Sequence, residues 1–144
     1  MRCLIVNPNR PHDVERGQRA LAKRLGRLHE RRVRDLGCIV CRRLGRGLVN
    51  ATLHHCRFPV GGGQRASAWY AIPLARPLHQ PGYKDAAWPW PEDIAIHGGR
   101  QAFARRYGSE PELLAATYAL LPYPMPRDEA EVLALGPILT GGRP

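Results

Sequence analysis

Two short segments with strand character constrain this chain more than any other feature. Residues 48–56 and 68–74 are rich in branched and aromatic side chains, and the glycine turn Gly61-Gly62-Gly63 lies between them. This pattern predicts a β-hairpin with a long tip. Because a two-stranded hairpin alone is only marginally stable, helices must supply most of the core. We therefore expect an α+β protein.

Segments with a helical pattern flank the predicted hairpin on both sides. They are residues 13–35, 99–107, 109–121 and 128–135. The first is basic and free of proline, and the third begins with Ser109 as its cap and Pro111 in its first turn. Residues 77–91, dense in proline and aromatic side chains, predict an ordered loop without regular structure, and residues 136–144 predict a frayed end.

The length of 144 residues fits one compact domain with helical extensions. We expect a basic N-terminal helical extension over residues 1–36, a central domain over residues 37–121, and a C-terminal tail with a short helix over residues 122–144.

The charge balance points to a polyanionic partner. The chain has 22 Lys and Arg against 12 Asp and Glu, a net charge of +10, and the basic excess is concentrated in its first half. Nucleic acid is one candidate for such a partner. Arginine-rich composition also follows from GC-rich genomes, and the basic helix can equally be a solvated face.

Export and membrane insertion are not expected. The apolar run at residues 3–6 is too short for a signal segment or a membrane span, and the apolar stretch at residues 113–121 is interrupted by polar side chains. We therefore expect a cytoplasmic protein. In that compartment its four cysteines are thiols or metal ligands rather than disulfides.

Cys38 and Cys41 have the two-residue spacing of a zinc knuckle. A structural zinc ion needs two more ligands, and the chain offers Cys56, the histidines and the distant Cys3. Buried free thiols are an equal alternative, because an unpaired cysteine packs as a small apolar residue.

The histidines carry a stronger signal. His54 and His55 are adjacent near the end of the first predicted strand, and His79 and His97 flank the aromatic loop. Neighbouring strand residues point to opposite faces, so the two adjacent side chains cannot share one core unless the strand bends. This arrangement favours a functional role over a structural one.

Histidines around a strand, a turn and a second strand suit metal-assisted hydrolysis of a phosphodiester. One imidazole can hold a divalent ion against the scissile phosphate, and a neighbouring imidazole can take a proton from the attacking water. Arginines can hold the phosphodiester in register. The arginines expected to do so are Arg42, Arg43, Arg57 and Arg65.

Short motifs add a family resemblance. They are Gly37-Cys38-Ile39-Val40-Cys41, Leu53-His54-His55, Gly63-Gln64-Arg65-Ala66-Ser67, Ile72-Pro73-Leu74 with His79, and Ile96-His97-Gly98. In their order and local pattern they resemble HNH-type nucleases related to the phage recombination enhancement function protein. The resemblance covers residues 37–108, about half of the chain.

This resemblance implies a ββα-metal core, also called HNH or His-Me finger, and a metal-dependent DNA endonuclease. It implies His55 as the general base, His54 and His79 as ligands of a magnesium, manganese or zinc ion, and His97 as a further candidate ligand. Arg65 would contact a DNA phosphate. A RecA-type recombinase filament would be a partner, and a phage or prophage in a bacterial host would be the source.

The chain departs from the family pattern at the structural zinc. Such nucleases usually carry a second Cys-x-x-Cys just before the histidine, where this chain has Ala75 and Leu78. A zinc ion at Cys38 and Cys41 then needs Cys56 or a histidine as a substitute ligand. Alternatively, Ala75 and Leu78 pack against the two cysteines.

The segment between His79 and His97 is also longer and more aromatic than the resemblance implies. Its Trp88 and Trp90 could stack on unpaired bases, but tryptophans flanked by prolines more often cover the edge of a core.

Three functions are compatible with the sequence. The first is an active metal-dependent DNA endonuclease. The second is a catalytically silent DNA-binding module that keeps the hairpin and the basic surface. The third is a phage accessory protein that acts through a protein partner. The presence of all four histidines favours the first.

Overall fold

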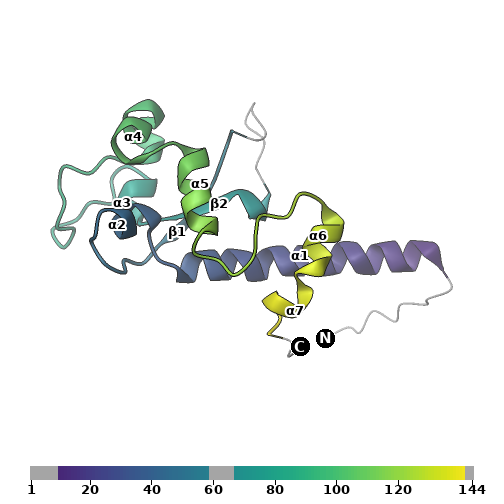
Figure 1. Cartoon of the computed structure of the whole chain (residues 1–144). Helices are drawn as coiled ribbons and strands as arrows, with labels where there is room; N and C mark the ends of the chain where they lie inside the picture. Colours follow the sequence, from purple (N-terminus) through teal and green to yellow (C-terminus); the bar gives the residue numbers. More distant parts are fainter. Residues whose placement is uncertain (1–9, 59–66, 142–144) are drawn as a thin grey trace.

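The computed structural model describes residues 10–58 and 67–141. Its longest element is a helix that packs against the sheet and against the C-terminal helices. Helix α1, Pro11–Asp35, runs along one side of the molecule, and a two-stranded sheet lies across its C-terminal half (Figure 1). The other elements are α2 (Ile39–Arg43), β1 (Thr52–His55), η1 (Ala68–Tyr70), β2 (Ala71–Leu74), α3 (Arg76–His79), η2 (Ile96–Gly98), α4 (Arg100–Tyr107), α5 (Glu110–Tyr118), α6 (Glu129–Ala134) and α7 (Gly136–Leu139). The fold is therefore mixed α and β, as predicted.

The predicted hairpin is present, with shorter strands than expected. β1 pairs antiparallel with β2, and the register sets His54 opposite Ile72 and His55 opposite Ala71. Residues 48–51 lie outside the ladder, and the carbonyl of Val49 instead accepts a hydrogen bond from the backbone N–H of Cys38 at 2.8 Å. The first half of the second predicted strand forms η1. The glycine turn at the tip lies outside the described residues.

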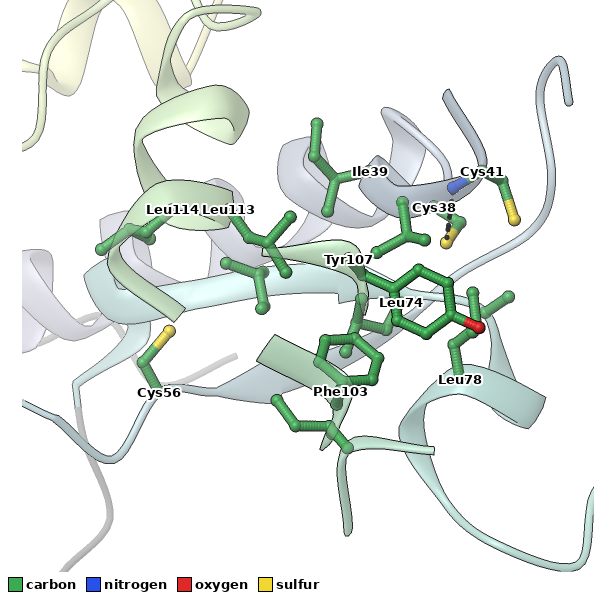
Figure 2. Packing of buried hydrophobic residues seen from close by; sticks show 14 residues of the cluster. Cys38, Ile39, Cys41, Cys56, Leu74, Leu78, Phe103, Tyr107, Leu113 and Leu114 are labelled. Carbon is green, nitrogen blue, oxygen red and sulfur yellow. Dashed lines mark hydrogen bonds between the residues drawn. The ribbon is translucent and has the colours of Figure 1, made fainter. Parts of the chain in front are cut away.

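The main core surrounds β2. All four residues of β2 are buried, because α1 packs against this strand on one side while α2 and α5 also contact it. Figure 2 shows Leu74 within a cluster that includes Phe103 from α4 and Leu113 from α5. The helices therefore supply most of the core around a small sheet, as expected for a hairpin of this size.

A second core joins α1 to the C-terminal helices. Leu25 and Trp69 pack there with side chains from α6 and α7, among them Val132 and Leu139. The frayed end predicted from residue 136 was wrong for residues 136–139, which form α7. Tertiary packing stabilises this helix, because the side chain of Leu139 is only 5% exposed in this cluster and its burial contributes free energy that a solvated chain end lacks.

His29 lies at the centre of this second core. Its side chain is fully buried, and its ring stacks on Trp69 with 4.4 Å between ring centroids. Its Nδ1 is 2.9 Å from the hydroxyl of Tyr123, and its Nε2 is 3.3 Å from the hydroxyl of Tyr118. These contacts tie α1 to α5 and to the segment after it.

The loop after α3 is organised by a buried carboxylate. Asp93 accepts hydrogen bonds from Arg46 at 2.7 and 3.1 Å, from Tyr107 at 2.7 Å and from the indole of Trp88 at 3.1 Å. Trp88 packs against the main core, and the guanidinium of Arg46 lies 4.1 Å from the ring centre of Trp90. Trp88 therefore covers a core edge. The loop prediction was wrong only at its start, where α3 forms around Pro77.

The helix ends follow local rules. Ser109 caps the start of α5, as the sequence predicts, and it forms a capping box with Glu112. Gly37 ends α1 with a φ of +73°, and a Cβ there would lie 2.6 Å from Cδ1 of Leu48. In the part of the chain that the structure describes, no helix is both long and apolar enough to cross a membrane.

Candidate metal centre

Three histidines from three different elements meet beside the hairpin. His54 comes from β1, His79 from the end of α3 and His97 from η2. One ring nitrogen from each lies within 4.8 Å of the others, and their ring centroids are 5.1 to 5.3 Å apart. His54 is buried, His79 half-buried and His97 exposed, so the cluster opens to solvent on the side of His97.

Local structure explains this convergence. Helix α3 starts two residues after β2 with Pro77 in its first turn, which returns the chain across β1. The hydroxyl of Thr52 in β1 donates to the carbonyl of Leu74 at 3.1 Å and contacts Nδ1 of His79 at 2.9 Å. In η2 the buried Ile96 anchors the backbone and leaves the next side chain, His97, outside the core.

Hydrogen bonds select the nitrogen that each ring leaves free. The hydroxyl of Thr52 donates its only proton to the carbonyl of Leu74, so it can only accept a hydrogen bond from His79. Nδ1 of His79 therefore carries the proton and donates to Thr52, and Nε2 of His79 keeps its lone pair. Nε2 of His54 is 2.7 Å from Oε1 of Glu110. A carboxylate accepts only, so Nδ1 of His54 keeps its lone pair. Two of the three rings therefore present a nitrogen that can bind a metal ion.

The electrostatics keep the imidazoles of His79 and His97 neutral. Burial, followed by positive charge on His54, His97 and His55, lowers the pKa of His79 to about 4. Burial also lowers the pKa of His97, and charge on His54 and Arg57 adds to this effect. Neutral imidazole is the form that binds metal ions. The donor set thus fits a divalent ion.

Glu110 connects this cluster to the chain after β1. Its Oε2 accepts the backbone N–H groups of Arg57 at 3.0 Å and Phe58 at 3.3 Å, and Arg100 lies 3.7 Å from Oε1. Burial raises the pKa of Glu110, but the hydrogen bonds from His54 and Arg57 lower it by a larger amount. The pKa of Glu110 is therefore below its usual value. Sequence reasoning missed Glu110, because in the sequence it is only the first residue of a well-capped helix.

His55 lies on the opposite face of β1 from His54, as strand alternation requires. Its Nε2 is 2.8 Å from Oε1 of Glu30 on α1, and the two side chains are 17% and 24% exposed. Sequence reasoning missed Glu30 as well, because nothing within the basic helix distinguishes this residue.

The cysteines stand apart from the histidine cluster. Cys38, Cys41 and Cys56 are buried free thiols, and Figure 2 places Cys56 on the far side of the core from the other two. Among the described residues, the three histidines are the only group of three or more side chains that could hold a metal ion. Cys56 is therefore no substitute ligand for a structural zinc, because the main core separates it from the Cys38–Cys41 pair.

Cys38 and Cys41 instead pack as core residues with a polar contact between them. The backbone N–H of Cys41 is 3.5 Å from Sγ of Cys38 at the start of α2. The side chain of Cys41 also donates to Cys38, and these contacts lower the pKa of the Cys38 thiol to about 7. Ala75 and Leu78 belong to the same buried cluster, which is the packing alternative considered from the sequence.

The expected DNA-binding arginines are spread over the chain. Arg57 is exposed and close enough to the cluster to affect His97. Arg42 donates to the carbonyl of Leu36 at 2.7 Å, and Arg43 is exposed on the same helix, α2. Arg65 lies outside the described residues.

Comparison with known proteins adds one match. The model of a family described as recombination enhancement, RecA-dependent nuclease, matches residues 22–122. This range contains the hairpin, the three clustered histidines and both glutamates that contact the paired histidines. No curated protein was found to match the chain.

Proposed function

Because the chain belongs to the family of RecA-dependent nucleases of recombination enhancement, we propose that it is a metal-dependent DNA endonuclease of the HNH type. The observation that carries this proposal is the cluster of His54, His79 and His97, whose ligand nitrogens lie within 4.8 Å of one another. Family membership gives the reaction class, and the cluster gives the chemistry by which this chain would perform it.

The order of elements supports the ββα-metal assignment. β1, β2 and α3 follow one another in the chain, and His54 on β1 faces His79 on α3 with 5.3 Å between their ring centroids. In this assignment the hairpin and the following helix would supply His54 and His79 to hold the ion. The third ligand, His97, comes from η2, beyond the loop that Asp93 organises.

Each histidine has one role in the proposed reaction. His54, His79 and His97 would hold the ion, for which magnesium, manganese and zinc are candidates. A bound divalent ion would stabilise the negative charge that builds on the scissile phosphate. His55 takes the proton from the attacking water as the water oxygen bonds to phosphorus, the bond from phosphorus to one sugar oxygen breaks, and that sugar oxygen leaves and takes a proton from solvent. Its Nε2 contacts Glu30, which leaves Nδ1 to accept that proton.

Basic side chains near the cluster would hold the DNA. Arg57 lies two residues after the end of β1, and Arg100 lies at the start of α4, 3.7 Å from Glu110. Both are exposed and both affect the pKa of His97. Guanidinium groups at these positions can bind the phosphates on either side of the cleaved bond. Arg100 was not among the arginines expected from the sequence.

A cleavage assay tests the proposed function. DNA is incubated with the protein and magnesium, manganese or zinc, with and without a RecA-type filament assembled on it. We expect cleavage that depends on the metal and on the filament, and a loss of about a hundredfold or more in rate for His55→Ala. His12→Ala is the matched control, because His12 is exposed at the start of α1, far from the cluster in the chain.

Two results would overturn the proposal. One is equal cleavage by the wild type and His55→Ala. The other is binding to DNA without cleavage under every metal and filament condition, which would favour a catalytically silent DNA-binding module.

A further inference from the structure

The two adjacent histidines are held by glutamates from two different helices. Glu110 at the start of α5 contacts Nε2 of His54 at 2.7 Å, and Glu30 on α1 contacts Nε2 of His55 at 2.8 Å. The first contact orients a proposed metal ligand. The second contact comes from a helix that precedes the hairpin and that the sequence predicts only as a basic extension.

Glu30 is part of a rigid support. The residue before it, His29, is fully buried and is bonded through both ring nitrogens. One turn earlier, Gly26 lets α1 approach η1 so closely that a Cβ there would lie 3.3 Å from Cβ of Ala68. The position of Glu30 relative to β1 is therefore fixed by packing on both sides.

The geometry of the contact determines how His55 can act. The Nε2–H of His55 donates to the carboxylate of Glu30, so Nδ1 keeps its lone pair. The same bond limits rotation of the ring about its side-chain torsions. A general base is effective only when its accepting atom is held near the attacking water, so this restraint would act on the reaction step rather than on DNA binding.

We propose that Glu30 is a positioning residue for His55, and that α1 is therefore a part of the active site. This inference rests on the proposed function, because it assigns a supporting role to the residue that takes the proton. Glu30 touches neither DNA nor the reacting atoms in this proposal. It acts only through the imidazole of His55.

Two variants separate this role from a general effect of charge on the helix. Glu30→Gln keeps the size of the side chain and removes the carboxylate. Glu15→Gln makes the same change on the same helix at an exposed residue that forms an ion pair with Arg19, at 3.5 Å. Single-turnover cleavage rate and DNA affinity are measured separately for both variants.

For Glu30→Gln we expect a cleavage rate about ten- to a hundredfold below wild type at saturating DNA, as for other partners of functional histidines. DNA affinity and the thermal unfolding midpoint should stay at the wild-type values, and Glu15→Gln should cleave at the wild-type rate. A rate for Glu30→Gln equal to wild type would overturn the inference. A faster rate would also overturn it, because Glu30 would then restrain His55 rather than position it.

A second readout does not depend on cleavage. In the metal-free wild type, nuclear magnetic resonance should show a downfield, slowly exchanging Nε2–H proton on His55, and Glu30→Ala should lose this resonance. Its persistence in Glu30→Ala would contradict the contact. Absence of cleavage by the wild type would remove the proposed function itself, whereas cleavage with no effect of Glu30→Gln would remove only the positioning role.

Discussion

Acidification should weaken this fold through His29. The hydroxyl of Tyr118 donates to the carbonyl of Trp69 at 2.7 Å, so its oxygen accepts from Nε2–H of His29. Nδ1 of His29 then accepts from the hydroxyl of Tyr123. A proton added at Nδ1 would remove this acceptor and place a charge in a fully buried site. Burial lowers the pKa of His29 from 6.5 to about 4 for this reason.

The size of the effect follows from proton linkage. Between pH 6.5 and about 4 the unfolded chain binds a proton at this residue that folded His29 does not bind. The stability contributed by neutral His29 is therefore fully present above pH 6.5 and is lost as the pH falls towards 4. Each pH unit between these values corresponds to about 1.4 kcal/mol, which makes the loss about 3 kcal/mol. The total free energy of unfolding of a small domain is only about 5 to 15 kcal/mol.

Urea unfolding of metal-free wild type and His29→Gln, at neutral pH and near pH 4, measures this loss. Glutamine does not titrate, and other titrating groups, including His79 and His97, contribute equally to both proteins. The wild type should lose about 3 kcal/mol more than His29→Gln on acidification. A difference below about 1 kcal/mol would refute the account of His29 as a buried neutral residue.

Two further predictions concern the frame around the candidate site. Asp93→Asn should lower the free energy of unfolding by about 3 kcal/mol, because it leaves the partly buried guanidinium of Arg46 without its anionic partner. Urea denaturation measures this change in the free energy of unfolding, and a change below about 1 kcal/mol would contradict a structural role for the Arg46–Asp93 ion pair. Gly37→Ala should cost about 3 kcal/mol and Gly45→Ala about 1, since both have positive φ and only Gly37 would bring a Cβ against neighbouring atoms. Equal shifts in the thermal unfolding midpoint would contradict this difference.

Local patterns were sufficient to predict the two strands and the longer helices of this fold, but not the short helices α2, α3 and α7. The helix at residues 13–35 and the capped helix from Ser109 depend on spacing and on end residues that the sequence shows directly. Strand limits are less local. β1 begins at Thr52 because β2 ends opposite it at Leu74, and α7 forms because Leu139 finds a buried place against α1. No pattern within either segment contains this information.

Part of the candidate site could also be predicted from the sequence, and part of it could not. Four histidines around a hairpin are unusual enough to be noticed in the sequence, and the structure brings three of them together. Their supports were not predictable, because Glu30 is 25 residues from His55 and Glu110 is 56 residues from His54. Only the packing of α1 and α5 against the hairpin brings each carboxylate to its ring.

Metal binding by the three histidines tests the central claim most directly. Chelator-treated protein is titrated with zinc or manganese by calorimetry, and the stoichiometry is compared between wild type and variants. We predict about one ion per chain for wild type and for Cys38→Ala, and loss of the ion in His54→Ala and His79→Ala. Retention of the ion by both histidine variants, or its loss only in Cys38→Ala, would contradict the account.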